Sequence, residues 1–370
     1  MKKSKIIIRT KSKTYPIYFG DGIIGSVGKL IDHNLPEVKK ICILYDKNIP
    51  AKLIKKLNKS LIKYKTQVYK ISVSERVKSL SFANRFIKNL LINNFNRSDC
   101  VIGFGGGILG DLSGFISSVT KRGIKFINIP TTLLAQVDAS IGGKTAVNSE
   151  LGKNLIGTFY QPDFVVTDVS VLKSLPPREI ICGYGEILKH SLISNKKFFL
   201  WLKNNALKII NQTDPTCVKK AILESCKIKS KIVGLDEKEK NLRMILNFGH
   251  TFAHAFEATK KFSKKLNHGE AVLLGMIIAC EFSYKKKLLD LKDLISIQEH
   301  YLYLNLPMDI TNIFNKKEID KIIFFIKKDK KNLNEKINLI LLKKIGLTTK
   351  PNSVAVKSSE LKEFLKSLYA

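Results

Sequence analysis

Residues 100–111 read CVIGFGGGILGD, an apolar run followed by three consecutive glycines and a fourth three positions later. Residues 100–104 have the length and apolar content of a buried strand, and the residues after Gly110 resume an apolar helical pattern. A strand, a glycine-rich turn and a helix in this order direct bare backbone N–H groups toward one point, which suits a phosphate or pyrophosphate. The stretch therefore predicts a phosphate-binding loop in an α/β domain.

The glycine loop differs from an ordinary dinucleotide fingerprint. Gly105, Gly107 and Gly110 satisfy the spacing GxGxxG, but the region about 20 positions further on, residues 126–132, lacks the acidic residue that such a site uses. We therefore expect an atypical Rossmann-like site. A tight glycine turn without a ligand is the alternative.

A second glycine segment matches a nucleoside triphosphate loop only in part. Gly143-Lys144-Thr145 ends like a Walker A motif, but Asp138 stands where the motif requires its first glycine. A carboxylate at that position repels phosphate, so we do not expect NTP hydrolysis. The segment 138–144 still combines polar and flexible residues, which favours a functional loop.

The chain as a whole separates into two regions. Up to about residue 170 short β-rich runs alternate with helical patterns, which is typical of a largely parallel α/β domain. After Pro176-Pro177 the periods are helical, so we expect a mostly parallel, atypical Rossmann-like α/β domain over 1–175 and an all-α domain over 176–370. The expected strands are 41–45, 67–71, 100–104, 125–129 and 164–167, and the expected helices are 186–193, 218–233, 250–259 and 270–284.

The charge of the chain is strongly positive, with 64 Lys and Arg against 31 Asp and Glu and a formal net charge of +33. One interpretation is a nucleic-acid-binding protein built on an inherited enzyme scaffold, or a surface for anionic lipid. The lysines are spread along the chain rather than concentrated on one element. We therefore expect compositional drift and an anionic small-molecule substrate, with neither a nucleic-acid nor a membrane partner.

Cysteine usage and apolar runs bear on the compartment. The six cysteines include no CxxC pair, which indicates reduced thiols. The N-terminus lacks the apolar run of a signal peptide, and the longest apolar stretch, 271–280, is too short to span a bilayer. We expect a soluble, cytoplasmic protein.

Three of the six histidines, His250, His254 and His268, lie within nineteen residues, and this clustering suggests a metal site. On a helix His250 and His254 are one turn apart, so helical spacing nominates both as ligands, with Glu257 on the same face. Hydrogen-bonded histidines without a metal are the alternative. The remaining histidines, His33, His190 and His300, are isolated in the sequence and are expected to be structural.

Several charged residues have no special meaning when each is considered alone. Glu186 and Lys189 are three residues apart, which by itself describes an ordinary pair on a helix surface. Lys229 and Arg243 likewise look like solvated charges. Only the combination of these residues with the other motifs favours a functional interpretation.

Taken together, these motifs resemble the 3-dehydroquinate synthase family, the NAD- and zinc-dependent cyclases of the shikimate pathway. The resemblance extends from about Asp46 to Gly346 and includes the segments 105–111, 129–148, 151–168, 175–189, 242–257 and 268–276. Where the family usually reads Asp-Gly-Glu-Gln-Tyr-Lys, residues 73–78 are Val-Ser-Glu-Arg-Val-Lys, so the glutamate and the lysine are kept and the first acid is lost. Gly185 stands where alanine is common, and Ser174 where threonine is common.

The resemblance implies a set of site residues. Zinc, or cobalt in its place, would be held by Glu186, His250 and His268, which replaces the hypothesis from helical spacing. The residues implied to contact NAD are Asn48, Glu75, Lys78, Gly105, Gly106, Gly107, Gly110, Asp111, Thr131, Thr132, Asp138, Lys144, Lys153 and Ser174. The residues implied to act in catalysis are Lys144, Lys189, Lys229, Arg243, Asn247 and His254, and substrate would also be held by Asn154, Lys330 and Arg122, the last from a partner subunit.

The resemblance also implies a reaction, the conversion of 3-deoxy-D-arabino-heptulosonate 7-phosphate to 3-dehydroquinate and phosphate on the route to aromatic amino acids. It comprises transient oxidation at C5 by NAD, elimination of phosphate, re-reduction and aldol closure, which makes the enzyme a lyase. The implied assembly is a homodimer with an NAD-binding domain over 1–175 and a helical metal- and substrate-binding domain over 176–370. The alternatives are another sugar phosphate cyclase, or a zinc polyol dehydrogenase of the same superfamily that releases NADH.

Overall fold

The computed structural model describes residues 4–263, 265–328 and 336–369, and the chain divides into two compact units. Unit 1 contains the chain up to Ile180 together with Lys229–Lys238, and unit 2 contains Ile181–Ile228 and the chain from Glu239 onward. Helix α7 (Pro215–Leu235) therefore begins in unit 2, while its last residues belong to unit 1.

Unit 1 is built on a seven-stranded sheet with the order β1-β2-β9-β6-β5-β3-β4. All neighbouring strands are parallel except β1 and β2, which form an antiparallel hairpin at one edge. The five predicted strands are confirmed, whereas the edge hairpin was not predicted. The strands are β1 (Ser4–Arg9), β2 (Thr14–Gly20), β3 (Lys40–Asp46), β4 (Lys65–Ile71), β5 (Cys100–Gly105), β6 (Lys125–Pro130) and β9 (Phe164–Asp168).

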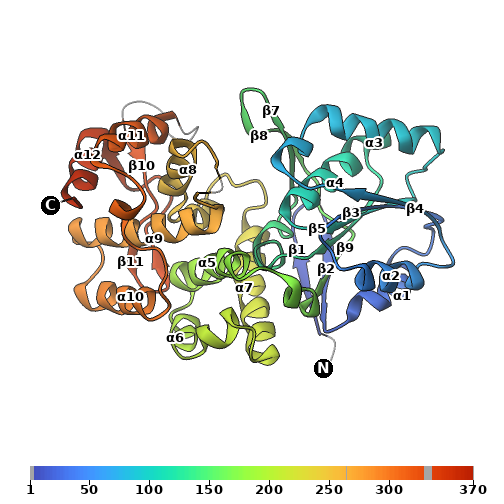
Figure 1. Cartoon of the computed structure of the whole chain (residues 1–370), viewed down its shortest axis with the longest axis horizontal. Helices are drawn as coiled ribbons and strands as arrows, with labels where there is room; N and C mark the ends of the chain where they lie inside the picture. The colour runs from blue at the N-terminus through green and yellow to red at the C-terminus, as the bar shows by residue number, and fades with distance from the viewer. Residues whose placement is uncertain (1–3, 264, 329–335, 370) are drawn as a thin grey trace. The chain divides into compact units, whose positions relative to one another are not determined.

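Helices cover both faces of this sheet, as a parallel sheet with fully buried strands requires (Figure 1). Helices α1 (Val27–Asn34) and α2 (Ala51–Ser60) lie on one face, and α3 (Leu80–Ile92) and α4 (Gly107–Val119) lie on the other (Figure 1). The core on the second face joins Phe86 of α3, Val101 of β5 and Leu112 of α4. Unit 1 also contains an antiparallel hairpin of β7 (Lys144–Ser149) and β8 (Gly152–Phe159).

Unit 2 is mainly helical, and the predicted helices are confirmed, with α8 matching its predicted bounds. The unit contains the rest of α5 (Pro177–Ser194), the first part of α7, α6 (Lys196–Ile210), α8 (His250–Thr259), α9 (His268–Lys285), α10 (Leu291–Tyr303), α11 (Ile319–Lys328) and α12 (Ser358–Ser367). Four short strands that were not predicted form two small sheets, β10 (Lys336–Asn338) with β13 (Ala355–Lys357) and β11 (Leu342–Lys344) with β12 (Leu347–Thr348).

Short helical turns complete both units: η1 (Ile23–Ser26), η2 (Glu75–Val77), η3 (Thr120–Arg122), η4 (Ala135–Ala139), η5 (Val169–Ser174), η6 (Leu242–Asn247), η7 (Ile310–Asn312) and η8 (Lys316–Glu318). The predicted fold class, a mostly parallel α/β region followed by a helical region, is confirmed.

The longest apolar stretch of the sequence, 271–280, lies in α9, and each of its residues is buried inside unit 2. Within the described ranges, no helix has both the length and the apolar content needed to cross a bilayer. The stretch therefore serves as the core of unit 2.

We predict that His300 makes unit 2 sensitive to acid. His300 is buried, its Nε2 lies 2.6 Å from the Tyr184 hydroxyl, and burial, helped by Lys203, lowers its pKa from 6.5 to about 4. The unfolded chain therefore binds this proton first as the pH falls, so stability present above pH 6.5 declines toward pH 4, by about 3 kcal/mol. The single tryptophan, Trp201 on α6, can report urea unfolding of this unit by fluorescence.

His300→Gln is the matched variant, because glutamine keeps a hydrogen-bonding group and does not titrate in this range. Its free energy of unfolding should fall less steeply than that of the wild type between pH 7 and pH 4. Parallel pH profiles for the two proteins would contradict the assignment.

Candidate active site

Unit 2 brings one carboxylate and two imidazoles to a single point. Glu186 comes from α5, and His250 and His268 are the first residues of α8 and α9. One ligand atom from each of the three side chains lies within 4.8 Å of the other two. An oxygen and two nitrogens at this spacing fit a zinc or cobalt ion and leave coordination positions for another molecule.

Close packing of α9 against α5 creates this arrangement. A Cβ at Gly269 would lie 2.2 Å from the Cα of Cys182, so only glycine allows the two helices to approach so closely. The Gly269 N–H donates to the Cys182 sulfur at 3.1 Å. The neighbouring His268 is thereby held beside Glu186, one turn further along α5.

The two histidines are oriented by hydrogen bonds at Nδ1. His250 Nδ1 lies 3.3 Å from the carbonyl oxygen of Phe248, and His268 Nδ1 lies 3.1 Å from Glu257 Oε2. Such bonds fix the ring orientation and leave Nε2 of each ring to bind a metal, as in many zinc sites.

Glu186 is fully buried, and its carboxylate oxygens accept no hydrogen bond from the described part of the chain. Oε2 forms an ion pair with the buried Lys189 ammonium, and Oε1 lies 3.6 Å from His250 Nε2. A buried carboxylate with so few donors is suited to a cation.

The pKa values of the two imidazoles shift in opposite directions. Burial, with smaller effects from Lys189 and the neighbouring histidines, lowers the pKa of His250 well below its ordinary value. Burial also lowers the pKa of His268, but the hydrogen bond to Glu257 and the nearby Glu186 charge outweigh it and raise the pKa overall. The His250 imidazole is therefore neutral near pH 7, as metal binding requires.

Three interpretations from isolated residues are wrong. Among the described residues, neither His254 nor Glu257 belongs to a group of three donors spaced for a metal, because Glu257 turns to His268. The Glu186–Lys189 pair is buried rather than at the surface, and α9 packs closely on α5 at Cys182 and Gly185. The helix predicted from residue 186 begins earlier, because Gly185 lies in the interior of α5.

In unit 1 the predicted cofactor residues gather where the parallel strands end. Strands β3 and β5 are neighbours, but the chain continues from them toward opposite edges of the sheet, and ligands bind at such switch points. Helix α4 starts directly after β5, and its N-terminus has no side-chain cap. The loops at this edge carry Asn48 after β3, Glu75 and Lys78 after β4, the glycine loop after β5, Thr131 and Thr132 after β6, and Ser174 after β9.

Lys78 connects a predicted cofactor residue to a predicted substrate residue. Its buried ammonium donates to Asp111 Oδ2 and to Asn154 Oδ1, both at 2.5 Å. Close by, Glu75 accepts a hydrogen bond from Lys153 Nζ at 3.0 Å. The β7–β8 hairpin is thus tied to the cofactor edge of the sheet. Val73, where the family usually has an acid, packs instead against the apolar core.

The segment after β6 carries a second buried pair. Lys229, from the part of α7 that belongs to unit 1, donates to the Asp138 carboxylate at 2.6 Å and to its carbonyl at 2.7 Å. Lys229 is only 5% exposed, so it is not a solvated surface charge. Lys144 is exposed at the start of β7, in a strand rather than at a helix N-terminus, as expected if the Walker A likeness is accidental.

The remaining predicted residues fall in several places. Arg243 is buried in η6, again contrary to a solvated charge, and Asn247 donates from Nδ2 to Glu239 Oε1 at 2.7 Å. His254 is exposed, with its ring centroid 5.5 Å from that of His250. Arg122 is exposed, with a positive φ of 64°. Lys330 lies outside the described residues.

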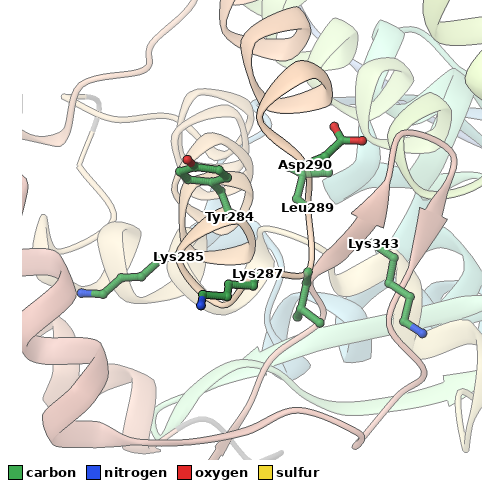
Figure 2. Close-up of a pocket in the computed structure, with 7 residues that line it drawn as sticks. Tyr284, Lys285, Lys287, Leu289, Asp290 and Lys343 are labelled. Atoms are coloured by element: carbon green, nitrogen blue, oxygen red, sulfur yellow. The ribbon is translucent and has the colours of Figure 1, made fainter.

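A pocket of about 590 Å³ in unit 2 is unrelated to these residues (Figure 2). It lies where α9 ends, α10 begins and β11 passes, and it is lined by Tyr284, Lys285, Lys287, Leu288, Leu289, Asp290 and Lys343. The Lys285 and Lys343 side chains point in opposite directions (Figure 2), so their charges do not converge on one ligand.

Comparison with known proteins agrees with this geometry. Residues 68–182 match the 3-dehydroquinate synthase N-terminal model, and residues 183–332 match the C-terminal model of the same enzyme. The chain belongs to the 3-dehydroquinate synthase family. A 3-dehydroquinate synthase from Pelagibacter ubique is 52% identical over 92% of this chain and 93% of its own length, and one from Thermoanaerobacter pseudethanolicus is 39% identical over 98% and 99%.

Solved structures share the fold of this 3-dehydroquinate synthase family member. A 2-deoxy-scyllo-inosose synthase in complex with carbaglucose-6-phosphate, NAD+ and Co2+ superposes with a TM-score of 0.86 at 26% identity, covering 98% of this chain and 99% of its own. ValA, a 2-epi-5-epi-valiolone synthase from Streptomyces hygroscopicus with NAD+ and Zn2+ bound, gives a TM-score of 0.85 at 23% identity, with coverages of 97% and 98%.

Sequence reasoning missed several residues that support the site. Glu239 positions Asn247, Glu257 orients His268, and Glu237 binds the turn between β1 and β2. Helical spacing singled out Glu257, but for the wrong role. Nothing in the local pattern marked the other two, because Glu237 bonds to distant segments and Glu239 itself lies outside the motifs.

We predict that His250→Ala and His268→Ala will each lose stoichiometric zinc, because two remaining donors bind the ion far more weakly than three. Glu257→Gln should keep the site but weaken zinc affinity by about 10- to 100-fold, since it removes the charge that orients His268. Metal content after dialysis against zinc, measured by atomic emission, tests these expectations.

His254→Ala is the matched control, because His254 adjoins the site without belonging to the ligand group. It should retain stoichiometric zinc. Full zinc content in His250→Ala would disprove the ligand assignment.

Proposed function

We propose that this protein converts 3-deoxy-D-arabino-heptulosonate 7-phosphate to 3-dehydroquinate and phosphate, as a phosphate-eliminating lyase that uses NAD and a divalent metal ion. The observation that carries the proposal is the group of Glu186, His250 and His268, assembled within 4.8 Å in a chain that matches both halves of the synthase. We assign NAD binding to a domain of residues 1–175 and metal and substrate binding to a helical domain of residues 176–370.

The residues present fit both groups. The buried Glu186 carboxylate and two oriented imidazoles suit zinc or cobalt, and the uncapped N-terminus of α4 after a glycine loop suits a pyrophosphate. When bound, NAD supplies reversible hydride transfer, and the metal ion supplies Lewis-acid polarisation of a substrate hydroxyl.

Cationic and amide side chains in the chain suit an anionic substrate. We assign Lys144, Asn154 and Lys229 in unit 1, and Lys189, Arg243 and Asn247 in unit 2, to hold its carboxylate and phosphate. Several of these cations are buried, so they are held in place before the substrate arrives. We assign His254 and Lys189 to move the proton of the C5 hydroxyl, and their position beside His250 and Glu186 supports this assignment.

A dehydroquinate-forming reaction is favoured over the other cyclase reactions of the superfamily. The match to the solved 2-deoxy-scyllo-inosose synthase is 26% identical, whereas the curated 3-dehydroquinate synthases reach 52%. Buried Arg243 and Lys229 also favour a substrate that carries a carboxylate as well as a phosphate.

We place the enzyme in the cytoplasm as a homodimer. All six cysteines lie among the described residues, are buried and form no disulfide, which fits a reducing compartment. For the dimer, β8 exposes Leu155, Ile156 and Phe159, an apolar surface that a second copy could cover. Tyr160 donates to the Ile124 carbonyl at 2.6 Å, which ties the residue after β8 to the segment that follows Arg122.

We predict that the purified protein, given the heptulosonate phosphate, NAD and zinc, will release phosphate and 3-dehydroquinate in equal amounts. Absorbance from NADH should not accumulate, because the hydride returns to the substrate. Coupled assays for phosphate and 3-dehydroquinate, with NADH absorbance recorded in parallel, test this prediction. Steady accumulation of NADH would indicate a polyol dehydrogenase, and phosphate without the carbocycle would contradict the proposed reaction.

If Arg122 acts in a partner's site, Arg122→Ala and His250→Ala should complement each other. Each variant alone should be nearly inactive, whereas mixed dimers contain one intact site of two and should restore about one half of wild-type activity. Co-expression with two different tags isolates the mixed dimer for assay. Inactive mixed dimers would contradict action in the partner's site.

A further inference from the structure

Glu237 is a buried acidic residue that the proposed chemistry does not use. It follows the end of α7 in unit 1 and is only 5% exposed. Its Oε2 accepts a hydrogen bond from the Ser12 N–H at 3.0 Å, and its Oε1 accepts one from the Ser12 hydroxyl and another from Gln161 Nε2 at 2.8 Å. Three donors from two distant segments therefore converge on one carboxylate.

This carboxylate is charged in the folded protein. Burial raises the pKa of Glu237, but the hydrogen bonds from Ser12 and Gln161 outweigh burial and keep it below the ordinary value. Charge-assisted hydrogen bonds of this kind are about twice as strong as neutral ones. The contact is therefore stronger than an ordinary turn contact.

The segments that Glu237 contacts are themselves fixed. Ser12 lies in a turn closed by the hydrogen bond from the Thr10 N–H to the Lys13 carbonyl at 3.1 Å, and this turn joins β1 to β2. Gln161 is buried against Gly143, where a Cβ would approach its amide to 2.6 Å. The end of α7 also lies against β1, because Gly234 packs on the Arg9 carbonyl.

Lys229 lies on α7 about two helical turns before Glu237, and its Nζ donates to Asp138 Oδ1 at 2.6 Å. Residues 229–235 are the part of α7 assigned to unit 1, and Glu237, two residues beyond the helix, binds this end to the β1–β2 turn. A shift of this segment would move the Lys229 ammonium away from the Asp138 carboxylate.

We propose that Glu237 is a positioning residue, which holds the end of α7 on the β1–β2 turn and on Gln161 so that Lys229 stays against Asp138 in its substrate-binding position. The inference rests on the proposed function for the role of Lys229. On this proposal the β1–β2 turn, at an edge of the sheet, contributes to substrate affinity by anchoring Glu237.

Glu237→Leu tests the proposal, with Glu224→Leu in α7 as the control, because Glu224 forms an ion pair with Lys227 and, within the described part of the chain, makes no hydrogen bond to the β1–β2 turn. We expect Glu237→Leu to raise the KM for the heptulosonate phosphate by about 10-fold or more with kcat changed less than about 3-fold, because a displaced lysine weakens ground-state and transition-state binding alike. Glu224→Leu should change neither constant. Equal KM values for Glu237→Leu and the wild type would overturn the proposal.

A double mutant shows whether the effect passes through Lys229. In a Lys229→Met background, Glu237→Leu should change kcat/KM by less than about 2-fold, because the side chain being positioned is gone. Independent, multiplicative effects of the two substitutions would show that Glu237 does not act on Lys229.

Hydrogen exchange gives a readout that needs no activity. Glu237→Leu should speed exchange in residues 229–238 and 10–14, and leave α6 unchanged. Unchanged exchange in both segments would show that Glu237 does not hold them together. A wild-type protein without cyclase activity would instead reject the proposed function and leave the exchange result valid. If Glu237→Leu does not fold, Ser12→Ala, on an exposed turn, removes one donor and should give the same changes on a smaller scale.

Discussion

The burial of one carboxylate constrains the whole helical unit. Glu186 is fully buried, and an ion removed from water costs several kcal/mol unless charges or hydrogen bonds compensate. Lys189 supplies one positive charge, and the imidazoles of His250 and His268 place nitrogen atoms around the other side. The approach of α9 to α5 at Gly269 makes this arrangement possible, so helix packing and the chemistry of the site depend on the same contact.

The same electrostatic rule orders unit 1. Lys78 and Lys229 are buried ammonium groups, and each is bonded to a carboxylate, Asp111 or Asp138, that belongs to the predicted cofactor set. These two ammonium groups are thus held in place by pairing, while most of the other lysines are exposed. The net charge of +33 therefore says little about the site, because its excess comes from side chains that take no part in it.

Local patterns predicted the elements whose residues interact with near neighbours in the chain. The run 100–104 became β5, the glycine loop became the start of α4, and the apolar period of 250–259 became α8. The β1–β2 and β7–β8 hairpins were missed, because edge and hairpin strands carry mixed polar patterns that resemble loops. Burial of Lys189, Lys229 and Arg243 was equally hidden, since helical spacing does not reveal which face another helix covers.

By itself, the sequence determined the order of the predicted strands and helices and the glycine loop that begins α4, and through resemblance it predicted the metal ligands. Those properties depend on residue type and on short spacings, which a linear chain already contains. Tertiary structure alone decided that Glu257 orients a histidine rather than binding a metal, that Lys78 joins Asp111 to Asn154, and that Glu237 reaches back to Ser12. Each of these contacts joins residues from separate elements, and only the packing of those elements sets the distance between them.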